Sequence, residues 1–109
     1  MPFPKWYNTY GPHLTLILSL FFRRVSFGRE KIVEILLQNS ANPNSRTNSQ
    51  ETPLHKAVEY GHLKGVEVLL NHGADRTLKN NRNRTPWQGA QYYKRGNYQA
   101  VIALLEEHK

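Results

Sequence analysis

Apolar residues recur at helical spacing in a short stretch near the middle of the chain, TPLHKAVEYG at residues 52–61. They stand at i, i+3 and i+4, which places them on one face of a helix: Leu54, Ala57 and Val58. Thr52 is suited to the N-cap, and Pro53 to the first helical position, where its missing N–H group costs nothing. Gly61 can adopt the left-handed conformation that ends a helix. The pattern therefore predicts a short helix between Thr52 and Gly61.

A second apolar pattern of the same kind follows directly and predicts a second helix. Its apolar residues are Leu63, Val66, Val68, Leu69 and Leu70, and Asn-His-Gly at residues 71–73 ends it, again with a glycine at the cap. Residues 74–84 are polar and rich in Asn, which indicates a loop or hairpin. Short isolated helices are marginal in water, so this helix–turn–helix–loop unit has to bury its apolar faces against a neighbouring unit.

The same unit recurs along the chain with a fixed period. Thr-Pro at residues 52–53 returns at residues 85–86, which is an offset of 33. Further matches at this offset are Ala57 with Ala90, Gly28 with Gly61, EILL at 34–37 with EVLL at 67–70, and Ala-Asn at 41–42 with Ala-Asp at 74–75. Several correspondences at one offset predict a repeat array in which each unit stacks on the next.

The unit at residues 52–75, TPLHKAVEYGHLKGVEVLLNHGAD, resembles an ankyrin repeat, whose length is about 33 residues and whose signature begins T-P-L-H-x-A. GREKIVEILLQNSANPN at 28–44 resembles the second half of a preceding repeat, and RTPWQGAQYYKRGNYQAVIALLEEH at 84–108 resembles a terminal one. The resemblance implies an all-α ankyrin-repeat solenoid at residues 28–109, with a partial repeat at 28–49, a full repeat at 50–82 and a terminal repeat at 83–109. Residues 1–27 are then an atypical N-terminal extension.

The terminal repeat departs from the pattern in two ways. It has Trp-Gln at residues 87–88, where the full repeat has Leu-His at 54–55. The stretch from Ala90 to Gly96 is also two residues longer than its counterpart, and the extra residues fall near 93–95. This predicts a longer first helix in the terminal repeat, which tolerates such a change because nothing packs on its outer side.

The N-terminal extension does not follow the period. Arg24 falls where the full repeat packs the small Ala57, and a buried unpaired Arg would be costly. The apolar run LTLILSLFF at residues 14–22 is a candidate for a degenerate capping helix that substitutes for a first helix. If it does not cover the first repeat, an apolar edge is left for self-association: Ile32, Val33, Ile35 and Leu36. The alternative interpretation of the N-terminal extension is that the chain is a truncated form of a longer array and has little independent activity.

The apolar run at residues 14–22 is too short for a membrane span, which needs about 20 residues. It also lacks the flanks of a signal peptide, because Lys5 is the only early positive charge and Phe-Phe-Arg-Arg at 21–24 is a poor cleavage site. The chain has no Cys, which excludes disulfides, Cys-ligated metal and thiol catalysis. These features predict a cytoplasmic or nuclear protein without a membrane span.

Positive charge is concentrated in one part of the chain. The formal net charge is +7, from 15 Lys and Arg against 8 Asp and Glu. A run of basic residues without an acidic residue among them extends from position 76 to position 95: Arg76, Lys79, Arg82, Arg84, Lys94 and Arg95. A field of one sign favours an acidic protein or a nucleic acid as the partner.

The residues show no pattern for catalysis or metal binding. His55 and His62 are seven residues apart, and no carboxylate or Cys completes a four-ligand set at metal spacing. The resemblance implies instead that His55 ties neighbouring loops together through side-chain hydrogen bonds. No nucleophile, phosphate-binding or dinucleotide-binding motif is present, and Glu106-Glu107 is an adjacent pair that does not share a helix face. The sequence predicts a non-catalytic protein without a cofactor or metal.

The resemblance implies a concave binding surface built from hairpin tips and the exposed side of each first helix. Carried over to this chain, the tip positions are Arg46, Asn48, Ser49, Glu51, Lys79, Asn81, Arg82 and Arg84, and the first-helix positions are Glu59, Tyr60, Tyr92, Tyr93, Lys94 and Arg95. Tyr and Arg are enriched at binding hot spots, so this electropositive surface is predicted to bind an acidic protein or peptide, as an adaptor does. Asn83 stands at a tip where the family usually has Gly, and Asn tolerates positive φ.

Nucleic-acid binding is the alternative for the basic stretch at residues 76–95. Basic residues interleaved with aromatic ones resemble a stacking platform in composition: Arg84, Trp87, Tyr92, Tyr93, Lys94, Arg95 and Tyr98. Trp87 stands at a core position of the repeat, and its burial would remove it from such a platform. Protein binding is therefore the favoured prediction.

Overall fold

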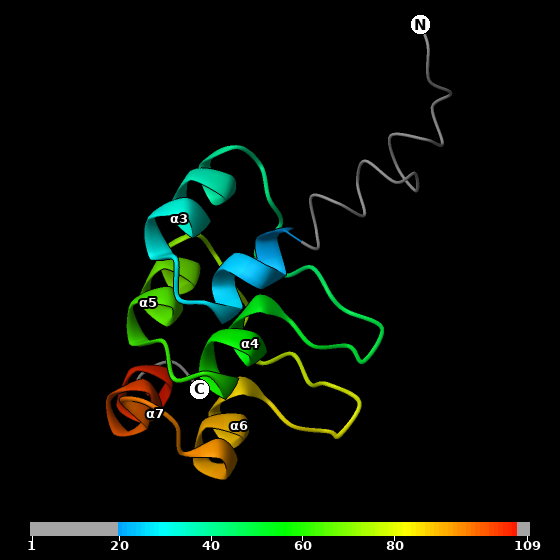
Figure 1. The fold of residues 1–109 in the computed structure, drawn as a ribbon. Coiled ribbons are helices and arrows are strands. Elements are labelled where there is room, and N and C mark those ends of the chain that lie inside the picture. Colours follow the sequence, from blue (N-terminus) through cyan, green and yellow to red (C-terminus); the bar gives the residue numbers. More distant parts are fainter. Residues whose placement is uncertain (1–19, 107–109) are drawn as a thin grey trace, which may run out of the picture.

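The computed structural model describes residues 20–106. Over this range the chain folds into short helices joined by turns and loops (Figure 1). The helices are α3 (Glu30–Gln38), α4 (Pro53–Glu59), α5 (Leu63–Asn71), α6 (Pro86–Tyr93) and α7 (Tyr98–Glu106), preceded by a helical segment at residues 20–26. The predicted all-α repeat fold is confirmed over this range. The predictions for residues 14–19 and for Glu107 lie outside the described residues.

The helices stand in two rows, with one helix of each repeat in each row. Figure 1 shows α3, α5 and α7 in one row, and the segment at residues 20–26 with α4 and α6 in the other. Helix α4 packs on α5 and α6, and α5 also packs on α3 and α7. The loops between helix pairs project from the side of the row that holds α4 and α6 (Figure 1). We define the hairpin face as the loop tips at residues 46–51 and 79–84, together with the exposed side chains of residues 20–27, of α4 and α6, and of the turns that follow these two helices.

Helices α4 and α6 begin with the same capping arrangement. The hydroxyl oxygen of Thr52 accepts the N–H of His55 (3.4 Å), and the N–H of Thr52 donates to Nδ1 of His55 (3.1 Å). Thr85 and Gln88 make the same two bonds in α6, at 3.3 and 2.9 Å. A proline occupies the first position of both helices, where its fixed φ suits the helix. The predicted helix start at Thr-Pro is confirmed in both repeats.

The terminal repeat differs from the full repeat at the turn between its helices. Helix α6 has 8 residues against 7 in α4, and Lys94 ends it in the left-handed conformation, with φ 52°. The second extra residue lies in the turn, so the predicted lengthening of the helix is correct for one residue only. A Cβ atom on Gly61 would lie 2.3 Å from the carbonyl oxygen of Arg95, and one on Gly96 would lie 2.4 Å from that of Gly61. This close approach of two backbones fixes where the helix has to end.

The apolar core lies between the two rows of helices. Helix α4 contributes Leu54, Ala57 and Val58, and α5 contributes Val66 and Leu69, each of them at most 2 % exposed. These are the residues that the helical spacing places on the inner faces. Their burial removes apolar surface that neither short helix could cover alone.

The segment at residues 20–26 takes the place of a first helix in the first repeat. Phe21 and Val25 are both 1 % exposed, and they stand one repeat period before Leu54 and Val58 of α4. Arg24 stands where α4 has its small alanine, and it is half-buried. Its Nε atom is buried and makes no hydrogen bond within the described residues. The substitute first helix that the sequence leaves open is thus present from residue 20 onward.

The predicted apolar edge of the first repeat is partly covered. On α3, Val33 is buried and Leu36 is half-buried, whereas Ile32 and Ile35 are 40 % and 56 % exposed. Half of the edge is therefore part of the folded core. Self-association through the exposed half stays a prediction.

The two long loops end in turns of the same build. The N–H of Gln50 donates to the carbonyl oxygen of Thr47 (2.9 Å), and the N–H of Asn83 makes the equivalent bond at the second tip (2.9 Å). Both Gln50 and Asn83 have a φ of 61°, which confirms the expectation for Asn83. The N–H of Asn81 donates to the carbonyl oxygen of Ser49 (3.0 Å). The two tips are therefore joined into one continuous edge.

Candidate binding surface

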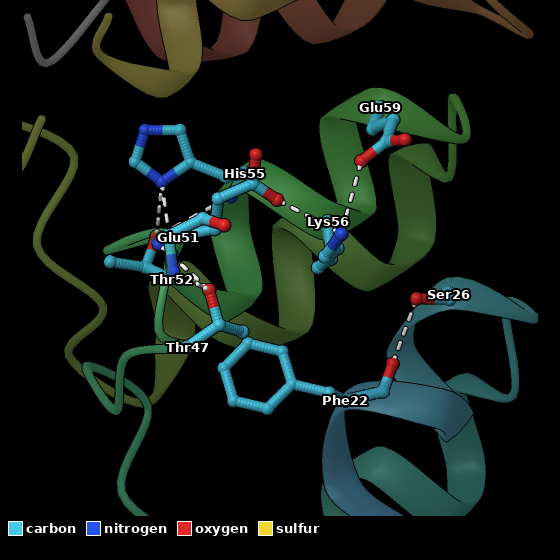
Figure 2. Close-up of polar contacts among 9 residues, drawn as sticks. Phe22, Ser26, Thr47, Glu51, Thr52, His55, Lys56 and Glu59 are labelled. Carbon is cyan, nitrogen blue, oxygen red and sulfur yellow. Dashed lines mark hydrogen bonds and ion pairs between the residues drawn. The ribbon is translucent and has the colours of Figure 1, made fainter. Parts of the chain in front are cut away.

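His55 connects helix α4 to the loop of the next repeat. Its Nδ1 atom accepts the N–H of Thr52 (Figure 2), so Nε2 carries the proton and donates to the carbonyl oxygen of Arg84 (2.8 Å). His55 is 5 % exposed, and this burial lowers the pKa of its ring, although the hydrogen bond to the Arg84 carbonyl acts to raise the pKa. The neutral ring positions Arg84 on the hairpin face, and it is the loop tie that the resemblance implies.

Arg84 begins a cluster of cations and aromatic rings in the terminal repeat. Its guanidinium carbon lies 4.0 Å from the centroid of the Tyr92 ring, within the range of a cation–π interaction. The rings of Tyr92 and Tyr93 meet edge to face at 5.2 Å, and the guanidinium carbon of Arg95 lies 5.6 Å from the Tyr93 centroid. We call Arg84, Tyr92, Tyr93 and Arg95 the Arg–Tyr cluster. The structure thus brings four of the predicted binding residues into contact.

The Arg–Tyr cluster is accessible and has no counter-charge in the described part of the chain. Tyr92 is 59 % exposed, and Arg95 and the neighbouring Lys94 are exposed as well. Within residues 20–106, neither Arg84 nor Arg95 forms an ion pair with a carboxylate. A guanidinium group presents a planar fork of donors that matches a carboxylate. The cluster therefore holds two such forks on an aromatic base.

The equivalent positions of the full repeat carry an ion-pair network instead. The Nζ atom of Lys56 lies 2.9 Å from Oε1 of Glu51 and 3.3 Å from Oε1 of Glu59 (Figure 2). Partial burial opposes the charge on Lys56, but bonds to the two carboxylates and their charges outweigh it and raise its pKa. The three groups carry one net negative charge. The sequence predicts an electropositive surface, whereas these three positions of the full repeat carry a net negative charge.

The remaining predicted tip residues fall into two groups. Arg46 links two repeats, because Nη1 donates to Oε1 of Gln50 (3.0 Å) and to the carbonyl oxygen of Lys79 (3.3 Å). The others are exposed at the tips: Asn48, Ser49, Lys79, Asn81 and Arg82. Arg46 thus stabilises the loops, while the exposed tip residues stand on the same loops that carry Glu51 and Arg84.

Sequence reasoning missed two residues that affect the charge and the apolar surface of the hairpin face. Lys56 is one, and its ion pairs decide the local charge. Phe27 is the other: it is 64 % exposed and stands one repeat period before Tyr60, which in turn stands one period before Tyr93. The period itself is the signal that identifies Phe27, but only if it is continued into the N-terminal extension. Tyr60 stacks on the ring of His62, with centroids 6.4 Å apart.

The nucleic-acid, metal and membrane alternatives can each be compared with the described residues. In the described range, no group of three His, Asp or Glu side chains is placed to hold a metal ion, and no helix is long and apolar enough to cross a membrane. Trp87 is half-buried and packs against the apolar core, so it does not belong to an exposed stacking platform with Tyr92 and Tyr93. The exposed groups of the hairpin face are guanidinium donors and aromatic rings.

Comparison with known families identifies the repeats. A family model described as ankyrin repeats, in three copies, matches residues 21–109. The match begins before the boundary predicted at residue 28, and it includes the buried Phe21 and Val25 of the first helical segment. No curated protein matches the chain.

Proposed function

Since the chain belongs to the ankyrin repeat family, whose repeats are in general protein–protein interaction modules, we propose that it is a non-catalytic adaptor for an acidic protein segment. The segment lies on the hairpin face, and its carboxylates meet the Arg–Tyr cluster. Lys79 and Arg82 at the second loop tip add positive charge that attracts such a segment during its approach.

The Arg–Tyr cluster is the observation that supports this proposal. Arg and Tyr dominate binding hot spots, because they combine a large contact area with oriented polar groups. The guanidinium of Arg84 is held 4.0 Å from the Tyr92 ring, and its backbone carbonyl is held by His55 at 2.8 Å. A side chain that is already positioned loses less conformational entropy on binding. Carboxylates are the ligand groups that these guanidinium forks favour.

Charge reversal of Arg84 tests the proposal. The full chain is titrated into a fluorescent peptide rich in Glu and Asp, and binding is followed by anisotropy. Arg84→Glu is expected to weaken binding by about tenfold or more, as for other hot-spot arginines. Lys64→Glu is the matched control, because Lys64 is an exposed base on α5, in the other row, and its reversal changes the net charge equally. Equal losses in the two variants, or no binding by the unaltered chain, would contradict the proposal.

A random-sequence oligonucleotide separates an acidic protein from a nucleic acid as the partner. Salt alone does not separate them, because both ligands are negative and both bind more weakly at high salt. The oligonucleotide is therefore added as a competitor to the bound acidic peptide. We expect unlabelled peptide to compete at lower concentration than the oligonucleotide. The reverse order would mean that the basic stretch serves a nucleic acid.

A further inference from the structure

Three aromatic side chains occupy the same position in three successive repeats. Phe27, Tyr60 and Tyr93 follow one another at the repeat period. Phe27 is 64 % and Tyr60 is 42 % exposed, and Tyr93 is half-buried against the ring of Tyr92. None of the three belongs to the buried core within the described residues. Stacking of the repeats therefore does not account for an aromatic residue at this position.

Phe27 and Tyr60 lie in turns, Tyr93 is the last residue of α6, and the turns at these three places lie side by side. Nε2 of His62 bonds to the carbonyl oxygen of Ser26 (2.8 Å), and a Cβ atom on Gly28 would lie 2.8 Å from the His62 ring. These contacts join the first turn to the second. The second and third turns are joined by the backbone approach of Gly61 and Gly96. We call the resulting row of side chains, Phe27, Tyr60 and Tyr93, the aromatic ladder.

The spacing of the aromatic ladder selects the conformation of a chain that lies along it. Packed neighbouring helices are about 8–10 Å apart, so one rung per repeat recurs at about that distance. In polyproline II every third side chain points the same way, and three residues advance about 9 Å. A β-strand presents a side chain to one face about every 7 Å, and an α-helix about every 5.4 Å. Of these three conformations, only polyproline II has a side-chain repeat that matches the expected spacing of the ladder.

We propose that the hairpin face binds an extended protein segment in the polyproline II conformation, with an apolar side chain at every third residue against Phe27, Tyr60 and Tyr93. This rests on the proposed function and specifies its partner. Grooves lined by aromatic residues are the surfaces on which such segments dock, because the ligand is already ordered before it binds.

The charge of the hairpin face orients the segment. The last rung, Tyr93, belongs to the Arg–Tyr cluster: Arg95 lies over its ring and Arg84 lies over the neighbouring Tyr92 ring. Neither guanidinium group has a carboxylate partner in the described part of the chain. The network of Lys56 with Glu51 and Glu59 lies in the repeat of the middle rung and is net negative. The acidic residues of the segment therefore lie at one end, over the terminal repeat. The part that crosses Tyr60 is apolar or basic.

Synthetic peptides with controlled spacing test the inference on the full chain. The first is proline-rich, with leucine at every third position and one acidic block. It is made in two forms, one with the block at the N-terminus and one with the block at the C-terminus. The second has the same composition, with leucine at every second position. The third is acidic and contains only Gly, Ser and Glu. The better of the two forms of the first peptide is expected to bind about tenfold more tightly than the second.

Truncation of a rung supplies the second readout. Phe27→Ala is expected to weaken binding of the spaced peptide about tenfold and to leave binding of the Gly-Ser-Glu peptide unchanged. Ile35→Ala is the matched control, because Ile35 is an exposed apolar residue of α3, in the other row of helices. Circular dichroism and urea midpoints establish that the variants remain folded, and Tyr60→Ala replaces Phe27→Ala if that variant does not.

The possible failures are distinguishable. Equal affinity for the two leucine peptides, or equal losses for Phe27→Ala and Ile35→Ala, overturns the aromatic ladder as a binding site. If the aromatic ladder fails these tests but Arg84→Glu still weakens binding of the acidic peptide, the proposed function stands without the ladder. If none of the acidic peptides binds the unaltered chain, both the ladder and the proposed function fail.

Discussion

The full repeat and the terminal repeat share one backbone plan, but they use equivalent positions for different chemistry. At three positions of the hairpin face, the full repeat has Glu51, Lys56 and Glu59, and the terminal repeat has Arg84, Gly89 and Tyr92. The first set forms an ion-pair network, and in the second an arginine stacks on a tyrosine. The backbone capping around both sets is the same. Side-chain changes at three positions thus reverse the local charge without altering the fold.

The two repeats also differ in what their capping side chains reach. His55 and Gln88 both close a capping box, but the second ring nitrogen of His55 also bonds to the next loop at 2.8 Å. Gln88 is exposed, and its side-chain bonds go to Thr85. His55 therefore links two repeats, whereas the bonds of Gln88 stay within its own helix start.

The largest effect is expected where the backbones of the two repeats meet. Gly61→Ala places a Cβ atom 2.3 Å from a backbone oxygen, at a φ of +70° that already disfavours a side chain. We expect the free energy of unfolding to fall by about 3 kcal/mol or more. Gly73→Ala is the control, because Gly73 has a φ of +86° and nothing within 4 Å of the added atom. It should cost only about 1–2 kcal/mol, measured for both by urea unfolding.

Loss of the tie between repeats ranks second. His55→Ala removes the acceptor for the N–H of Thr52 and one of the two donors to the part-buried carbonyl of Arg84, which keeps the N–H of Asn80. We therefore expect a cost of about 2 kcal/mol. Gln88→Ala removes only a local, exposed cap and should cost less than about 1 kcal/mol. Urea unfolding of the two variants measures the difference. Equal costs would show that the bond to Arg84 contributes nothing.

The pH dependence of stability follows from the same histidine and is smaller. The folded pKa of His55 lies below the ordinary value of 6.5, so at low pH the unfolded chain binds the proton more readily. The stability that the neutral ring provides is complete above pH 6.5 and is lost as the pH falls below it, toward the lower folded pKa. Stability measured between about pH 7.5 and 5.5 should therefore decrease, and His55→Gln should flatten the profile.

The carboxylate of Asp75 does not contribute to the change in stability between about pH 7.5 and 5.5. Hydrogen bonds from Thr77 lower the pKa of Asp75 below its ordinary value of 3.8. The stability that its charge contributes is therefore present above pH 3.8 and is lost only as the pH falls through the lower folded pKa. A profile for His55→Gln as steep as that of the unaltered chain would contradict the assignment to His55.

The smallest effect is expected for the stacked pair of the terminal repeat. A double-mutant cycle of Arg84→Ala and Tyr92→Ala should give a coupling of about 0.5–1 kcal/mol in the free energy of unfolding, the size of an accessible cation–π contact. A cycle of Lys56→Ala and Glu59→Ala measures the equivalent pair in the full repeat, where about 0.2–1 kcal/mol is expected. Zero coupling for Arg84 and Tyr92 would mean that Arg84 is not held in place for a ligand.

The starts of α4 and α6 and the ends of α4 and α5 were predictable because their signals are local. A Thr-Pro pair begins α4 and α6, and a glycine three residues after the last apolar position follows the end of α4 and of α5. The end of α6 was not predictable in this way. Its turn is set by the contact of Gly61 with Arg95 and Gly96, which belong to another repeat. The sequence left the helix at residues 20–26 as one of two interpretations, because Arg24 breaks the small-residue position of the repeat although Phe21 and Val25 keep its apolar positions.

The period, the helices of the full repeat and most of the side chains on the hairpin face could be predicted from the amino-acid sequence. The contacts between those side chains could be seen only in the folded chain: Arg84 with Tyr92, Lys56 with two carboxylates, and Arg46 with a loop carbonyl. Helix signals depend on neighbours within a few residues, whereas these contacts depend on distances across the chain, which stacking of the repeats sets.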